Sequence, residues 1–150
     1  MQINPDIFKA YDVRGLYPGE INEEVARSIG RGFAAYLKTD RVAVSRDMRV
    51  SSPGIAAAFT DGVLMQGTDV VDCGMLGTDM LYFASGRFDS PGVMLTASHN
   101  PAHYNGIKLC LAGAKPVGLD TGLEDIKLMA EEVAAGGGPR PAVQPGTERD

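Results

Sequence analysis

The segment Ala97–Pro101 (ASHNP) places a hydroxyl and an imidazole side by side. Asn-Pro is typical of a turn, so Ser98 and His99 are expected on a tight, exposed bend. Successive backbone N–H groups in such a bend can bind an anion. A serine hydroxyl there can attack phosphorus while His99 supplies a proton or a charge. The same residues can also form a plain turn with a surface histidine, and local chemistry alone leaves both interpretations open.

A second polar segment, Tyr104–Lys108 (YNGIK), contains an Asn-Gly pair that predicts a turn into an antiparallel strand. Lys108 alternates with the apolar residues Ile107 and Leu109 and is therefore expected to face away from the core. Its ammonium group can bind a phosphate or simply solvate the sheet face. Both alternatives remain at this point.

The other candidate residues gather in two stretches, FKAYDVRG near the start and SRDMR further on: Lys9, Tyr11, Arg14, Arg46 and Arg49. Arginine forks match phosphate oxygens with two parallel hydrogen bonds. Several arginines near strand ends in a chain of net charge -5 therefore hint at an anionic ligand. Pairing within the chain, with Asp12 or Asp47, is the alternative.

Helices and strands alternate around these segments. Apolar periodicity and β-branched runs predict strands at 41–45, 69–73, 92–96 and 106–111, and helices at 22–37, 52–66, from Thr78 through Ala84, and from Thr121 to Gly136. The predicted helix caps are Asn22, Ser52, Thr78 and Thr121. Gly30 and Gly32 inside the first helix indicate close packing against a neighbour.

This order predicts the α/β class, with a three-layer α/β/α sandwich around a mostly parallel four-stranded sheet. The connection of about ten residues from the third to the fourth strand is too short for a crossover helix, so the last strand is expected to be antiparallel. Ligands of such folds collect beyond the carboxyl ends of the strands, where the candidate residues lie.

Composition narrows the class of protein further. The 150 residues suit one domain, expected over 1–138, with the proline-rich residues 139–150 as a linker or tail toward a second domain. The acidic balance argues against nucleic-acid binding, and no apolar run approaches the roughly 20 residues of a membrane span. No signal peptide is evident, and Cys73 and Cys110 suit reduced thiols, so a cytoplasmic location is expected.

The segments FKAYDVRG, SRDMR, VMLTASHNP and YNGIK, in this order and spacing, resemble the α-D-phosphohexomutases, in particular the N-terminal domain of the phosphomannomutase/phosphoglucomutase branch. The resemblance runs through most of the chain, and TASHNP is its most specific part. It implies that Ser98 is a phosphoserine, that His99 and Lys108 assist catalysis, and that Tyr11, Arg14 and, with less support, Arg46 line the phosphate site.

The resemblance also implies a reaction and a cofactor. Hexose 1-phosphate and 6-phosphate of mannose or glucose would interconvert through phosphoserine 98 and a hexose 1,6-bisphosphate, which also serves as activator. One Mg²⁺ would be held by a phosphate oxygen on Ser98 and by three aspartates of a D-x-D-x-D loop in a second domain. That loop is missing from these residues, so the isolated chain is expected to be inactive and the remaining domains of the same protein are its expected partners.

Two other functions compete with this one. A free-standing phosphosugar-binding module would act with a partner chain that supplies the other sites. A serine hydrolase using Ser98 and His99 would need a G-x-S-x-G elbow, which the sequence lacks, and adjacent residues are poorly placed to act as nucleophile and base.

Overall fold

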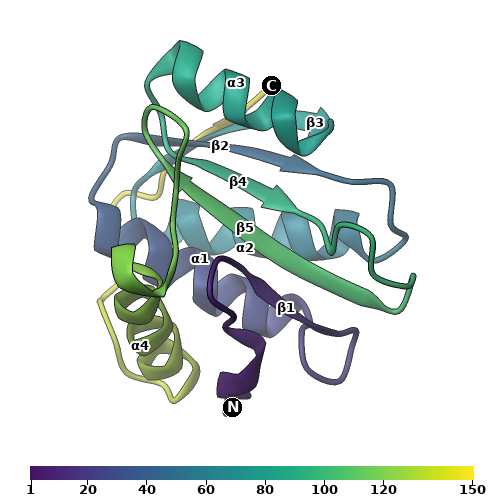
Figure 1. The fold of residues 1–150 in the computed structure, drawn as a ribbon. Helices are drawn as coiled ribbons and strands as arrows, with labels where there is room; N and C mark the ends of the chain where they lie inside the picture. The colour runs from purple at the N-terminus through teal and green to yellow at the C-terminus, as the bar shows by residue number, and fades with distance from the viewer.

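The computed structural model describes residues 1–150 as one twisted sheet with helices on both faces (Figure 1). The strands are β1 (Val13–Leu16), β2 (Arg41–Arg46), β3 (Asp69–Met75), β4 (Gly92–Leu95), β5 (Tyr104–Leu111), β6 (Lys115–Pro116) and β7 (Glu148–Arg149). The helices are α1 (Glu23–Leu37), α2 (Ser52–Met65), α3 (Thr78–Phe88) and α4 (Leu123–Ala134), with short 3-10 turns η1 (Pro5–Ile7) and η2 (Leu119–Thr121).

The strand order is β1-β5-β4-β2-β3-β7, with β6 paired to β5. Strands β4, β2, β3 and β7 run parallel, whereas β5 is antiparallel to both β4 and β1. The predicted α/β class, the four predicted strands and the antiparallel direction of the fourth are therefore confirmed. The short β4–β5 connection forces this reversal, since no helix intervenes.

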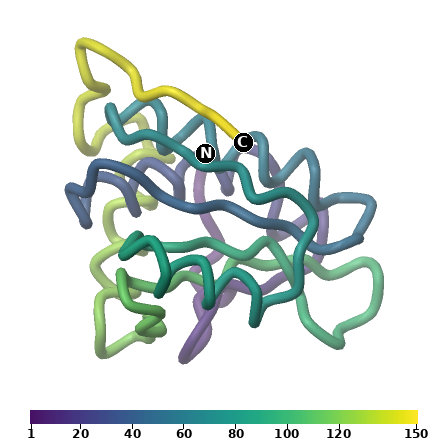
Figure 2. Tube along the Cα trace, turned by 90° about the horizontal axis from the view of Figure 1, so that it is seen from above, coloured from purple at the N-terminus to yellow at the C-terminus, as the bar shows by residue number.

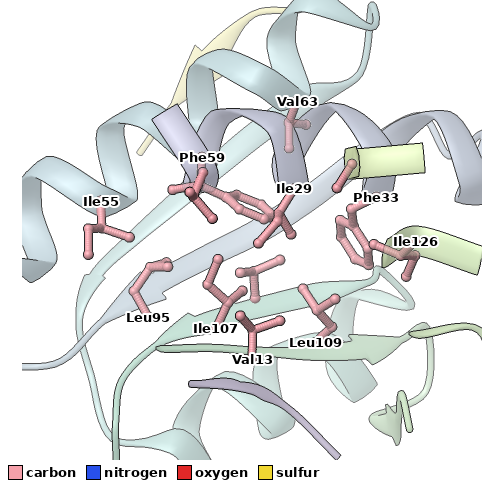
Figure 3. Close-up of a cluster of buried hydrophobic side chains, with 14 of the residues drawn as sticks. Val13, Ile29, Phe33, Ile55, Phe59, Val63, Leu95, Ile107, Leu109 and Ile126 are labelled. Atoms are coloured by element: carbon pink, nitrogen blue, oxygen red, sulfur yellow. The ribbon is translucent and has the colours of Figure 1, made fainter. Parts of the chain in front are cut away.

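The helical layers on the two faces of the sheet differ in size. Helices α1, α2 and α4 cover one face and build the main core, in which Phe33 and Phe59 have ring centroids 6.0 Å apart. Figure 3 shows side chains of these helices pointing toward strand residues that include Leu95 and Ile107. Helix α3 covers part of the other face through a smaller cluster around Leu81. Burial of apolar side chains on both faces of β2 and β4 explains their continuous apolar sequences.

Glycines set the distance between α1 and α2. A Cβ atom on Gly30 would lie 2.3 Å from the Phe59 carbonyl oxygen, and one on Gly62 would lie 2.2 Å from the Arg27 carbonyl oxygen. Gly32 makes the corresponding approach to α4, where a Cβ would lie 3.0 Å from the Ile126 carbonyl oxygen. The close packing predicted for Gly30 and Gly32 is confirmed.

One helix cap is as predicted and three are not. The Asn22 side chain accepts a hydrogen bond from the N–H of Val25 at the start of α1. Ser52 is instead the first residue of α2, and its hydroxyl donates to Asp47. Thr78 is likewise the first residue of α3, after Gly77. The Thr121 hydroxyl bonds to Gly118 within η2 and does not cap α4.

Strands β1, β6 and β7 were not expected from the sequence. Strand β7 lies in the segment predicted as a linker or tail and pairs with β3, as the yellow segment beside the teal strand in Figure 2 shows. The domain boundary at residue 138 stays a prediction. Cys73 and Cys110 are free thiols, and burial raises the pKa of each. No helix combines the length and the apolar character that a bilayer crossing requires.

Candidate functional site

Two loops meet at the carboxyl ends of β2 and β4, at the right-hand end of the sheet in Figure 1. One is the β2–α2 loop (residues 47–51), and the other is the β4–β5 loop (residues 96–103). Ser98 lies on the second loop and is exposed, as expected. Its φ of 56° is in the left-handed region, which costs a residue with a Cβ roughly 1–2 kcal/mol. Surrounding contacts must therefore hold this residue in place.

The first of these contacts comes from Thr96. The N–H of Ser98 donates to the Thr96 hydroxyl oxygen at 3.0 Å, and that hydroxyl donates to an Asp47 carboxylate oxygen at 2.7 Å. Asp47 also accepts hydrogen bonds from the Arg49 N–H and from the Ser52 hydroxyl. The carboxylate thus ties the end of β2 to the backbone of the serine.

Arg49 makes the second set of contacts. Its Nη atoms donate to four backbone carbonyls of the β4–β5 connection, at 2.7–3.1 Å: Ser98, Asn100, Pro101 and Tyr104. Its Nε donates to Asp47 at 3.1 Å, and the Arg49 side chain is only 7% exposed. The carbonyls of the serine loop therefore converge on one guanidinium group.

Asn105 extends the polar network below the loop. Its side chain is fully buried and donates to the hydroxyls of Ser51 and Ser52 at the start of α2. Asn105 and Gly106 lie inside β5, so the turn that the Asn-Gly pair predicted is wrong. Gly106 serves a close approach instead, because a Cβ there would lie 2.3 Å from the Val13 carbonyl oxygen. Strand pairing on both sides has overridden the local turn preference.

An open cavity of about 630 Å³ lies beside Ser98. Its lining comes from the two loops: Met48, Arg49, Val50, Ser98, His99, Asn100, Ala102 and His103. His99 is exposed at this cavity and forms no hydrogen bond within the chain. Its imidazole is thus free to meet a ligand beside the Ser98 hydroxyl, as the sequence predicts.

Arg14 reaches the same loop from β1. Its Nη atoms donate to Asp12 at 2.6 Å and to the Asn100 side-chain oxygen at 2.9 Å, while its buried Nε has no partner. The pairing with Asp12 that the sequence left open is present. Two of the five N–H donors of this guanidinium are used, so three remain, of which the one on Nε is buried.

Three other predicted residues, Lys108, Tyr11 and Arg46, do not line the cavity beside Ser98. Lys108 is half-buried on the sheet face away from the main core, as predicted, and makes no ion pair. Tyr11 is 76% exposed and packs over Gly118, outside the Ser98 cavity. Arg46 lies 3.9 Å from Asp72 and lines a separate cavity of about 220 Å³ against α2. Of the candidate residues, Ser98, His99 and Arg49 therefore line the cavity, and Arg14 contacts Asn100 on the same loop.

No group of three or more His, Cys, Asp or Glu side chains in the chain converges as a metal site. A phosphate on Ser98 would present oxygen ligands, but Mg²⁺ prefers a full octahedron of oxygens. The residues present therefore do not by themselves form the magnesium site that the family resemblance implies.

Comparisons of the sequence and the fold with known proteins place the chain among its relatives. The model of the family described as "Phosphoglucomutase/phosphomannomutase, alpha/beta/alpha domain I" matches residues 5–134. Two proteins called phosphomannomutase, from Klebsiella pneumoniae and Escherichia coli, are each 45% identical over 126 residues, or 83% of this chain. A crystal structure of a phosphoglucomutase/phosphomannomutase family protein from Burkholderia thailandensis matches 99% of the chain with a TM-score of 0.85 and 35% identity.

The shares of these relatives that the chain covers differ. It covers 80% of the Klebsiella protein but 28% of the Escherichia coli protein and 33% of the Burkholderia structure. The match to the larger relatives is thus confined to about a third of their length or less.

Proposed function

The chain belongs to the phosphoglucomutase/phosphomannomutase family as its α/β/α domain I, and from this premise we propose that it supplies the phosphoserine of a hexose-phosphate mutase. The observation that carries the proposal is the presentation of Ser98. Among the seven serines of the chain, Ser98 alone is exposed, at an open cavity and on a bend held by its neighbours. Such a hydroxyl suits exchange of a phosphoryl group with a ligand that enters from solvent.

The proposed chemistry is two transfers in opposite directions. The free hydroxyl oxygen of a hexose monophosphate attacks the phosphorus on Ser98, and the bond from phosphorus to the serine oxygen breaks. The attacking hydroxyl loses its proton and the serine oxygen gains one, so a hexose 1,6-bisphosphate and free Ser98 result. The second transfer returns the other phosphate to Ser98 and releases the isomeric monophosphate.

Positioning and neutralisation of charge are the main demands of such a transfer. His99 lies at the cavity with both ring nitrogens free of bonds to the chain, which suits proton transfer at the serine oxygen. Arg14 retains Nη N–H donors without a partner, and Lys108 retains its ammonium group without an ion pair. Contributions of Tyr11 and Arg46 to phosphate binding rest on the family resemblance alone.

The remaining parts of the proposal concern the whole protein. We expect the magnesium ligands other than the phosphoserine oxygen, and the groups that select mannose or glucose, to come from further domains of the same protein. A cytoplasmic location and the use of hexose 1,6-bisphosphate as activator belong to the same proposal.

Intact-mass measurement of the whole protein with its proposed further domains, after incubation with Mg²⁺ and glucose 1,6-bisphosphate, tests the role of Ser98. The whole protein should carry the added mass of one phosphate, and its Ser98→Ala variant should carry none. Thr39→Ala, which removes a hydroxyl remote from the cavity, should keep the phosphate. Phosphate that persists in Ser98→Ala, or that is absent from the wild type both as purified and after incubation, would contradict the proposal.

A further inference from the structure

We infer that Arg49 is a positioning residue that holds the phosphoserine loop in its reactive shape and is not itself a phosphate ligand. A guanidinium group has five N–H donors. In Arg49 all five are used: one on Asp47 and four on the carbonyls of Ser98, Asn100, Pro101 and Tyr104. No donor is left for an incoming phosphate, even though Arg49 lines the cavity beside Ser98.

The charge of Arg49 is neutralised as well. Asp47 lies 3.1 Å from its Nε, and the pair is almost fully shielded from solvent, with 7% and 11% of the two side chains exposed. Arg14 is also paired with a carboxylate, that of Asp12, but three of its five N–H donors have no partner; Lys108 makes no ion pair. The cations available to an anion are thus distinct from the one that shapes the loop.

The four carbonyls span the whole connection from β4 to β5. Because these carbonyls point toward the Arg49 guanidinium, the opposite side of the loop faces solvent. The Ser98 side chain lies on that exposed side. The bond from the Ser98 N–H to Thr96, and from Thr96 to Asp47, fixes the same residue from its amide side. These two sets of bonds, which we call the Arg49–Asp47 clamp, account for the left-handed φ of Ser98.

Lysine cannot replace arginine in this role. It keeps the positive charge but has three donors on one atom and no planar fork. If Arg49 served only as a charge near phosphate, Arg49→Lys would retain much of its effect. If Arg49 is the clamp, Arg49→Lys loosens the loop nearly as much as Arg49→Ala.

Amide hydrogen exchange followed by NMR distinguishes these outcomes in the 150-residue chain. In Arg49→Lys we expect the amides of Ser98, Asn100 and Tyr104 to exchange at least about tenfold faster, while core amides of β4 and β5 change by less than about twofold. Arg41→Lys is the matched variant, since Arg41, at the start of β2, bonds a single carbonyl, that of Phe88. It should leave the β4–β5 loop unchanged. Loop amides that keep wild-type protection in Arg49→Lys would overturn the inference.

A wild-type measurement covers the case in which Arg49→Lys does not fold. The Nη resonances of Arg49 should be resolved and in slow rotation, because every N–H is bonded, whereas freely rotating Nη groups would overturn the clamp. The inference takes its functional meaning from the proposed phosphoserine. The two are tested separately, because unphosphorylated Ser98 would count against the mutase role, whereas an unprotected loop would count against the clamp.

Discussion

At the scale of single residues, the site consists of one exposed hydroxyl and a buried set of groups that hold its backbone. Ser98 contributes the exposed hydroxyl, while Thr96, Asp47 and Arg49 hold the backbone that carries it. Thr96 is central because its hydroxyl is both acceptor for Ser98 and donor to Asp47. A buried polar group that is left without a hydrogen-bond partner typically lowers the free energy of unfolding by about 1–3 kcal/mol.

Thr96→Val should therefore destabilise the chain by about 1–3 kcal/mol, because valine keeps the shape but leaves the Ser98 N–H without a partner and removes one of the donors to Asp47. Urea-induced unfolding measures this change. Thr39→Val is the matched variant, since the Thr39 hydroxyl makes one exposed bond of 3.3 Å, and it should stay within about 0.5 kcal/mol of wild type. Equal effects of the two substitutions would contradict the role given to Thr96.

The sequence predicts the exposed residues of this site better than the buried residues that support them. Ser98 and His99 stand out because a turn dipeptide follows them directly. The contact of Arg49 with the loop joins positions some fifty residues apart, for which a single sequence holds no local signal. The turn predicted at Asn105 is wrong for the same reason. The hydroxyls to which its side chain donates, those of Ser51 and Ser52, lie more than fifty residues away in the sequence.

At the scale of elements, the helices that support the site are positioned by glycines. Gly30 on α1 and Gly62 on α2 permit backbone contact between the two helices, and α2 begins at the polar network below Ser98. The glycines of α1 could be recognised from the sequence because glycine is costly in a helix interior. Strand β1 could not, since its four residues include an arginine and a glycine and its partner β5 lies far along the chain.

Alanine substitutions test the helix contact. Gly30→Ala should destabilise the chain by about 1–3 kcal/mol despite its better helix propensity, because the new Cβ would overlap the Phe59 carbonyl oxygen. Gly86→Ala in α3 should stabilise it by about 0.4–1 kcal/mol, because no atom lies within 4 Å of the new Cβ. Thermal unfolding of both variants measures the difference. A neutral or stabilising effect of Gly30→Ala would contradict the close packing.

At the scale of the whole molecule, the last residues form β7, the edge strand of the sheet on the side opposite β1. Thr147 donates to Asp69 from its backbone N–H at 2.7 Å and from its hydroxyl at 3.1 Å. These two hydrogen bonds, chiefly the backbone one, hold the pKa of Asp69 below its ordinary value. A carboxylate with a lowered pKa strengthens the folded arrangement above its unfolded pKa, and this contribution disappears as the pH falls through the lowered value.

The attachment of β7 should therefore persist at neutral pH and weaken only in acid below the ordinary pKa of aspartate, about 3.9. The NMR shift of the Thr147 amide against pH measures this transition. Asp69→Asn should remove the transition, and Asp61→Asn, at an exposed pair with Arg27, should leave it in place. A wild-type midpoint at or above the ordinary aspartate value would contradict the assignment.

The place of β5 between β4 and β1 also has a consequence for biosynthesis. Val13 leaves the ribosome long before Ile107, which lies opposite it, and Leu95 pairs with the same residue from the other side. A nascent chain that ends before β5 holds an unpaired β1 and a β4 with one open edge, and it lacks the Tyr104 carbonyl that Arg49 contacts. Assembly of the serine loop must therefore wait until most of the domain has been translated, and earlier intermediates need protection from association.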